Sequence, residues 1–212
     1  LGGGGSSDLD ASLDSTKRNI IVANSGDCIN ITSPSNTVRN QYCGFGSDGT
    51  TEITNGSSTI SFDTAATNNI VGGIEANQGN LMCASASFNV YLLLNASAGN
   101  GNSIRGNTIG CDDFRIPLAG FGNLVAEMIT RPLGGTSNNN YTAPTFSHVT
   151  PLSVSGTGAC ASCAVDIYGQ DVARGAVYVG SGTADGSGNW AFEADLSAYD
   201  YAIATFTGSQ GS

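Results

Sequence analysis

The feature that most constrains the fold is a repeat of 33 residues, carried by three short motifs that each begin with asparagine. The motifs are residues 36–40 (NTVRN), 69–73 (NIVGG) and 102–106 (NSIRG). Aligning them places Asn36, Asn69 and Asn102 in one column, and each is followed two positions later by a β-branched residue. Two equal spacings predict that successive copies stack on one another, with the asparagines forming a ladder.

A second ladder recurs at nearly the same interval, at residues 28–32 (CINIT), 59–63 (TISFD) and 89–93 (NVYLL). Each member alternates apolar with other residues, as a short strand with one buried face does. No apolar stripe with the period of a helix competes with this pattern. The sequence therefore predicts an all-β fold with a common interior formed by Ile29, Ile31, Ile60, Phe62, Val90 and Leu92.

These repeats also resemble those of a known family. The strings GNSIRGNTIG, NTVRN, NNIVGG and ANQGNLM are similar to the right-handed parallel β-helix repeats of large secreted, adhesin-like surface proteins of prokaryotes. The resemblance covers about residues 19–120. It implies a short right-handed parallel β-helix at a cell surface. Family members usually carry Thr or Ile at the positions of Cys43 and Cys111 and Ser near Cys83, which implies that cysteines were added to the solenoid.

The composition changes at residues 134–144 (GGTSNNNYTAP), which predict a linker. Beyond it, longer alternating strands are expected at 145–150, 152–157, 163–168, 176–180, 190–196 and 201–207. The strings VSGTGACASCAVDIYG and YVGSGTADGSGNWAFEADL resemble bacterial Ig-like modules, which implies an antiparallel β-sandwich. The expected organisation is a flexible N-terminal arm (1–17), a β-helix with an irregular last coil or cap (18–133), a linker (134–143) and an Ig-like domain (144–212).

Charge is scarce and one-sided, with 7 Lys+Arg against 17 Asp+Glu and a net charge of −10. Such a surface repels nucleic acid and anionic lipid, so neither is expected as a partner. The apolar runs are far too short to span a bilayer. Six cysteines in a chain rich in Gly, Asn, Ser and Thr indicate an oxidising, extracellular or cell-surface setting.

The pair Cys160 and Cys163 has four readings: a redox pair, half of a zinc site completed by His148, a haem attachment, or a structural disulfide. Haem attachment requires His where Ala164 stands, and a redox pair is expected at a helix N-terminus rather than before a strand. We therefore expect a structural disulfide.

The other cysteines, Cys28, Cys43, Cys83 and Cys111, allow three pairings within the chain. Stacked coils bring distant residues together, which favours Cys43 with Cys111 or Cys28 with Cys83. Pairing between subunits is equally allowed.

Many β-helices are polysaccharide lyases, which need clustered carboxylates for calcium and a basic side chain. Arg39 and Arg105 stack in register, but Gly72 separates them. The nearby acids fall in turns: Asp48, Asp112 and Asp113. The acidic arm lacks the Gly and the bidentate Glu of an EF-hand loop, although it contains Asp8, Asp10 and Asp14. With one histidine, His148, a Ser-His-Asp triad is not expected. We predict no catalytic residue, metal or cofactor.

Two further features concern glycans. An aromatic platform for sugars would need four aromatic residues to be exposed: Tyr42, Phe45, Tyr91 and Phe114. Sequons for N-glycosylation occur at Asn30, Asn55, Asn95 and Asn140, about as many as chance gives in a chain with this much Asn, Ser and Thr.

A solenoid of only a few coils has two open ends that need a cap or a partner. We therefore expect a non-enzymatic extracellular structural protein, either a subunit of a surface filament or a segment of an adhesin or stalk. Copies would self-associate into a homopolymer through the β-helix ends, the N-terminal arm and disulfides. The alternatives are a carbohydrate-active enzyme of the lyase type and a module that binds surface glycans.

Overall fold

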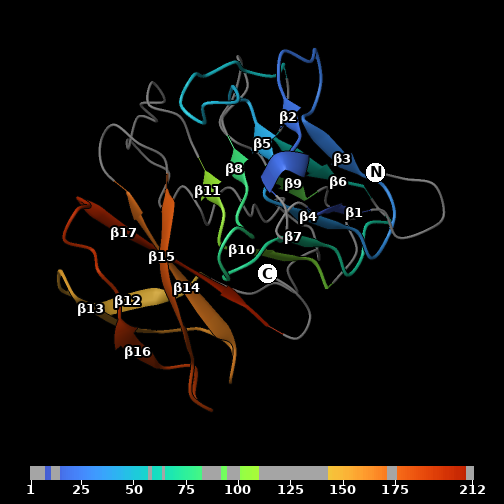
Figure 1. Ribbon diagram of the computed structural model, residues 1–212. Coiled ribbons are helices and arrows are strands. Elements are labelled where there is room, and N and C mark those ends of the chain that lie inside the picture. The colour runs from blue at the N-terminus through green and yellow to red at the C-terminus, as the bar shows by residue number, and fades with distance from the viewer. Residues whose placement is uncertain are drawn as a thin grey trace.

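The computed structural model describes residues 8–10, 15–56, 59–63, 65–82, 92–94, 101–109, 143–170 and 176–208. Over these residues the chain is all-β, with one turn of 3-10 helix, η1 (Ser15–Lys17). Parallel sheets form the N-terminal part and antiparallel sheets the C-terminal part. Figure 1 shows the two parts side by side.

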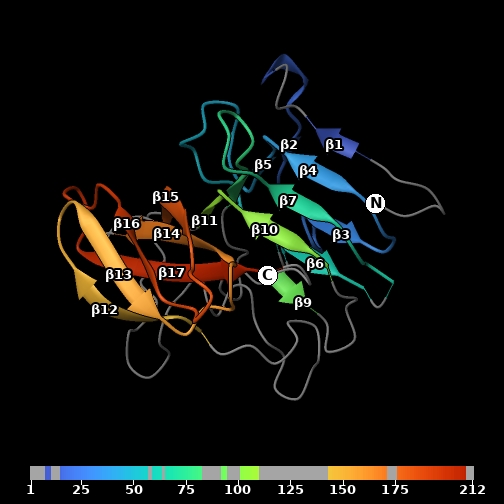
Figure 2. The ribbon, with the colours of Figure 1, turned by 90° about the horizontal axis from the view of Figure 1, so that it is seen from below.

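Three parallel sheets wrap around one interior in the N-terminal part. Sheet A contains β1 (Asp8–Asp10), β4 (Thr37–Arg39), β7 (Ile70–Gly72) and β10 (Ser103–Arg105). Sheet B contains β2 (Ile20–Ile21), β5 (Tyr42–Cys43), β8 (Leu81–Met82) and β11 (Thr108–Ile109). Sheet C contains β3 (Ile29–Ile31), β6 (Ile60–Phe62) and β9 (Leu92–Leu94). The chain visits the sheets in the order A, B, C and then returns to A, so each coil adds one strand to each sheet (Figure 2).

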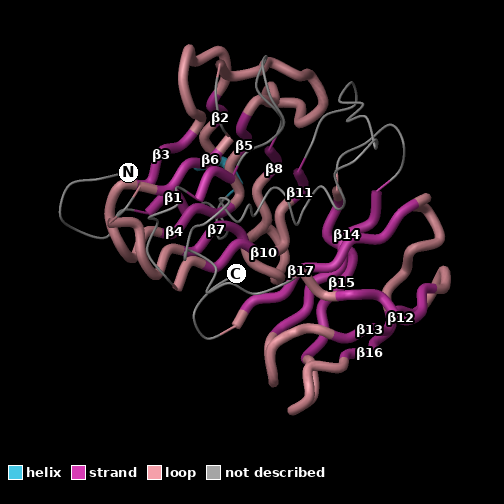
Figure 3. Tube along the Cα trace, turned by 180° about the vertical axis from the view of Figure 1, so that it is seen from behind, coloured by secondary structure: helices cyan, strands magenta, loops and turns pink. Residues whose placement is uncertain are grey.

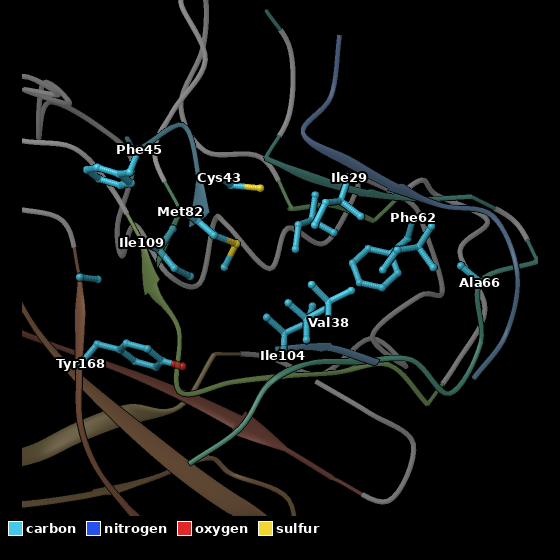
Figure 4. Close-up of a cluster of buried hydrophobic side chains, with 14 of the residues drawn as sticks. Ile29, Val38, Cys43, Phe45, Phe62, Ala66, Met82, Ile104, Ile109 and Tyr168 are labelled. Carbon is cyan, nitrogen blue, oxygen red and sulfur yellow. The ribbon is translucent and has the colours of Figure 1, made fainter. Parts of the chain in front are cut away.

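The first predicted column is confirmed. Val38 lies opposite Val71, and Val71 lies opposite Ile104. All three are at most 1% exposed. Val38 and Ile104 point into the interior beside Phe62 and Met82 (Figure 4). Burying an aliphatic side chain of this size contributes roughly 1.5–3 kcal/mol, so these columns are a main source of the coil's stability.

The second ladder is correct in its first two members and wrong in the third. Ile60 lies opposite Leu92 and Phe62 opposite Leu94, whereas the sequence alignment had placed Val90 and Leu92 there. A shift of two residues keeps every side chain on the same face of a strand. Because the apolar run 90–94 is continuous, alternation alone could not distinguish the two registers.

Two antiparallel sheets of three strands form the C-terminal part. Sheet D contains β12 (Thr145–Val149), β13 (Ser153–Thr157) and β16 (Trp190–Glu193). Sheet E contains β15 (Val177–Thr183), β14 (Ala164–Gln170) and β17 (Tyr201–Thr207). The chain crosses between the sheets after β13, after β15 and after β16, which is compatible with the Ig-like interpretation.

A second apolar cluster lies between sheets D and E. Val165, Ile167 and Trp190 are at its centre, each 3% exposed or less. The ring of Phe146 meets that of Trp190 edge to face, with centroids 5.3 Å apart. Along β16, Trp190 and Phe192 face inward and Ala191 and Glu193 outward, which confirms the predicted alternation.

The opposite face of sheet E packs on the coil. Tyr168, Ala176 and Ile203 belong to the coil's apolar cluster and are 4% exposed or less. Strand β14 is therefore buried on both faces, as its burial along Val165 to Gly169 reflects. Figure 3 shows sheet E between the coil and the rest of the sandwich. The sequence predicted two separate units and gave no sign of this contact.

The ends of the predicted segments can be placed only in part. The segment 1–17, expected to be a flexible arm, contains a strand, because Asp8–Asp10 forms β1 and pairs in parallel with β4. Asp10 lies opposite Arg39, and a charged pair at that position favours this register. The irregular last coil or cap, expected over residues 118–133 at the end of the β-helix, lies outside the described residues, as does all of the predicted linker except residue 143.

Candidate functional site

The predicted asparagine ladder is present along the start of sheet A. The Oδ1 atom of Asn69 accepts the backbone N–H of Asn36 at 2.8 Å and its Nδ2–H at 2.8 Å. In turn, Oδ1 of Asn102 accepts the backbone N–H of Asn69 at 3.0 Å and its Nδ2–H at 2.9 Å. The three residues are 4% exposed or less. Each immediately precedes a strand, so the ladder fixes where the coil turns into sheet A.

A second ladder, which the sequence analysis missed, runs along the start of sheet B. Its members are Asn19, Gln41, Asn80 and Asn107. Oε1 of Gln41 accepts from the backbone and side chain of Asn19, at 2.9 and 2.7 Å. Oδ1 of Asn107 accepts from Asn80 in the same way, at 3.0 and 2.9 Å. The intervals between the bonded members are 22, 39 and 27 residues, so a search for equal spacing could not find them.

A third pair follows β2. Oδ1 of Asn55 accepts the backbone N–H of Asn24 at 3.1 Å and its Nδ2–H at 3.0 Å. Asn55 also donates to the carbonyl of Ile21 at 3.1 Å and is 2% exposed. The side chain of the Asn55 sequon is therefore buried and hydrogen-bonded in the folded protein. Asn30 is exposed on β3, and its sequon stays a prediction; Asn95 and Asn140 lie outside the described residues.

An ion pair joins the last coil to the sandwich. Arg105 donates from Nε to Oδ2 of Asp166 at 2.7 Å and from a terminal nitrogen to Oδ1 at 2.6 Å. The same nitrogen donates to the hydroxyl of Ser181 at 2.8 Å. The Asp166 side chain is fully buried, and the bond to Asp166 raises the pKa of Arg105. A two-pronged contact of this kind fixes orientation as well as distance.

Tyr168 completes this joint. Its hydroxyl accepts the backbone N–H of Gly106 at 3.1 Å, and its ring meets that of Tyr178 edge to face at 5.9 Å. Burial raises the pKa of Tyr168, and the charge of Asp166 raises it further. Beside it, Ile109 and Ala176 exchange two backbone hydrogen bonds of 2.9 and 2.7 Å. Strand β11, at the edge of sheet B, is thus paired with the sandwich.

The two stacked arginines contact different acidic partners. Arg39 pairs with Asp10 at 3.4 Å and donates to the carbonyl of Gly72 at 3.1 Å, while Arg105 is bound to Asp166. Gly72 has a φ of 83°, and a Cβ there would lie 2.1 Å from the carbonyl oxygen of Arg105, so only glycine fits between them.

The turn acid Asp48 is used within its own turn. It accepts from the backbone N–H of Thr50 and from the N–H and hydroxyl of Thr51. The bond from the Thr51 hydroxyl is the main cause that lowers its pKa. Asp112 and Asp113 lie outside the described residues.

The described residues contain two disulfides, and one corrects the pairing that the sequence favoured. Cys28 is bonded to Cys43, with a Cα separation of 5.9 Å. The sequence had favoured Cys43 with Cys111 or Cys28 with Cys83. The bonded residues are instead 15 apart, and they join the residue before β3 of sheet C to β5 of sheet B in the next coil. Cys83 and Cys111 lie outside the described residues.

The predicted short disulfide between Cys160 and Cys163 is confirmed, with a Cα separation of 5.3 Å. Both sulfurs are committed to this bond, so they are not zinc ligands, and His148 is exposed on β12. Over the residues that the structure describes, no group of three His, Cys, Asp or Glu side chains is placed to hold a metal ion.

The aromatic platform is not formed by its two described members. Phe45 is 6% exposed and belongs to the core. Tyr42 is half-buried, and the guanidinium of Arg18 lies 4.1 Å from the centre of its ring. Tyr91 and Phe114 lie outside the described part of the chain.

Comparisons with known proteins give no family. No protein-family model matches the chain, and a search of the curated proteins finds no match. In the described part, no helix has the length and apolar character needed to cross a bilayer.

Proposed function

We propose that this protein is a non-enzymatic extracellular structural protein, a subunit of a surface filament or a segment of an adhesin or stalk. The observation that carries the proposal is that the two ends of the coil stack differ. One end is covered by sheet E, through Arg105, Tyr168 and the pairing of Ile109 with Ala176. The other end consists of the first strands of the three sheets, β1, β2 and β3.

This asymmetry suits a building block that joins to others in one direction. Edge strands pair readily with another chain, and soluble proteins usually shield them. At the covered end, sheet E of the same chain protects the edge strands. A contact between unlike ends of a subunit generates chains or rings rather than closed pairs.

The distribution of hydrogen bonds also supports a structural role. The buried carboxamides form hydrogen bonds that hold successive coils together. Arg105 and Asp166 form an ion pair that holds the coil to the sandwich. The two disulfides favour an oxidising, extracellular setting. Groups used in this way stabilise a shape and are not available for substrate chemistry.

Electron microscopy and light scattering of the purified chain, over a range of protein concentrations, test the proposal. We expect linear assemblies or end-to-end oligomers whose repeat matches one subunit. Isolated monomers under all conditions would remove the filament version. Cleavage of acidic polysaccharides, with or without calcium, would overturn the non-enzymatic role, and selective binding on a glycan array would favour the glycan-binding alternative.

A further inference from the structure

The amide ladders have a direction. In every bonded pair, the residue of the earlier coil donates its backbone N–H and, for the asparagines, its side-chain N–H to the side-chain oxygen of the later coil. Asn19 donates in this way to Gln41, and Asn24 to Asn55. Two of the ladders therefore begin in the first coil, at Asn19 and Asn24, with a side-chain oxygen that still has room to accept.

These oxygens lie at the surface. Asn19 and Asn24 are exposed, and within the described residues neither Oδ1 atom accepts a hydrogen bond. Strand β2 lies between them and is the edge strand of sheet B at the first-coil end of the stack. Its residue Ile20 is 43% exposed.

The backbone of β2 has a free side that matches these oxygens. Asn19 and Ile21 direct their carbonyls to Tyr42 and Gly44 of the next coil, at 3.0 and 2.9 Å. Neighbouring residues of a strand point their backbone groups in opposite directions, so the N–H and C=O of Ile20 point away from the stack. One edge thus presents a backbone donor, a backbone acceptor and a carboxamide acceptor in the geometry that the coil repeats internally.

We infer that this edge is a docking site for an extended peptide segment that runs parallel to β2 and carries Asn or Gln immediately before an apolar pair. The carboxamide and N–H of that residue donate to Oδ1 of Asn19, as Asn80 donates to Asn107. Its carbonyl accepts from Ile20, as the carbonyl of Asn19 accepts from Tyr42. The inference rests on the proposed structural role and specifies the chemistry by which a partner joins.

A second copy cannot supply this segment by stacking its last coil. At that end β11 is already paired with Ala176, and the side chains of Asn102 and Asn107 donate to the carbonyls of Ala66 and Val71. Two first coils placed face to face would bring carboxamide oxygens together, which repel. The ladder direction thus selects a strand-like segment as the occupant.

A peptide that copies residues 77–82 (NQGNLM) is a suitable probe, because it contains the Asn80 donor and strand β8. We expect saturable NMR shifts of the full-length protein confined to residues 19–24, and slower hydrogen exchange at the amide of Ile20. The same peptide with Asn80→Asp is the matched control. This peptide keeps the shape but loses the side-chain N–H donor and gains a negative charge. We therefore expect its affinity to be lower by about tenfold or more.

On the protein side, Ile20→Pro removes the outward N–H and leaves the bonds to β5 intact, as proline at a strand edge does. We expect it to abolish binding with little change in melting temperature, whereas Ile20→Thr should bind normally. Equal binding of both peptides, undiminished binding by Ile20→Pro, or no binding at millimolar peptide would each overturn the inference. Linear assembly without peptide binding would reject this site and leave the proposed function, whereas peptide binding by a strictly monomeric protein would support the site and remove the filament version of that function.

Discussion

A buried carboxamide destabilises a fold unless its oxygen and its nitrogen are both hydrogen-bonded. Asn69 meets this condition, because its side chain accepts from Asn36 and donates to Asn102 while it is fully buried. The same residue aligns three coils at their turn into sheet A. At this position, therefore, a change of one atom tests the whole ladder.

We predict that Asn69→Asp destabilises the protein by roughly 2–4 kcal/mol at neutral pH. The carboxylate cannot donate to Asn102, and it places a negative charge against that residue's Oδ1. Urea unfolding measures the loss. Part of it should be recovered as the pH falls and the new carboxyl is protonated. Asn77→Asp is the control, since Asn77 is exposed; a similar loss there would contradict the role of the ladder.

Tyr168 gives a prediction in the alkaline range. Burial and the charge of Asp166 raise its pKa in the folded state above the ordinary value of about 10. Its contribution to stability is therefore complete below pH 10 and falls as the pH rises, by up to about 1.4 kcal/mol per pH unit for one proton.

Tyr168→Phe removes this proton and also the acceptor for the N–H of Gly106. We expect the variant to be about 1 kcal/mol less stable at pH 8, and this deficit to shrink or reverse by about pH 11. Chemical denaturation at both values gives the difference. A deficit that stays constant with pH would show that Tyr168 does not ionise on unfolding.

At the scale of elements, short strands of the coil depend on their neighbours, because β2, β5, β8 and β11 contain only two residues each. The disulfide from Cys28 to Cys43 ties one of these strands, β5, to the residue before β3 and closes a separation of 15 residues. A cross-link over that distance contributes about 3 kcal/mol in the chain-entropy description, and the Cys160 to Cys163 link, with a separation of 3, contributes less.

We predict that replacing Cys28 and Cys43 by Ser lowers the melting temperature markedly, and that the same change at Cys160 and Cys163 lowers it much less. Calorimetry of the two double variants under oxidising conditions measures this. Addition of reductant should then bring the wild-type protein close to the first variant. Equal losses in both variants would indicate that loop length does not decide the effect.

Sheet A was predictable because the asparagines that precede its strands recur at a constant interval in the sequence. Sheet B was not, since its ladder includes Gln41 and its spacing varies with loops of different length. The register of β9 failed because a continuous apolar run fits two alignments two residues apart. A workable local signal was available: Asn or Gln directly precedes each strand of sheet B.

At the scale of the whole molecule, the contact between coil and sandwich was invisible in the sequence. Asp166 lies in the middle of a strand in which apolar and polar residues alternate, so its carboxylate is expected to be exposed to solvent. Asp166 is buried because the coil covers the second face of sheet E. An alternating strand pattern predicts only one buried face. In the sequence, Arg105 stands out only because it aligns with Arg39 in the repeat. The structure shows that it anchors the sandwich to the coil.

The joint therefore gives the last prediction. Arg105→Met leaves the fully buried Asp166 without its cation, and we expect a loss of about 3–5 kcal/mol. Since the pair bridges the two parts, calorimetry should also show the unfolding of coil and sandwich separating into two transitions. Arg39→Met makes the same change where the partner, Asp10, is 30% exposed, and should cost about 1 kcal/mol or less. The double variant Arg105→Met with Asp166→Leu should recover most of the loss, because an apolar pair carries no unpaired charge. Equal losses for the two arginine variants would mean that the ion pair does not hold the sandwich against the coil.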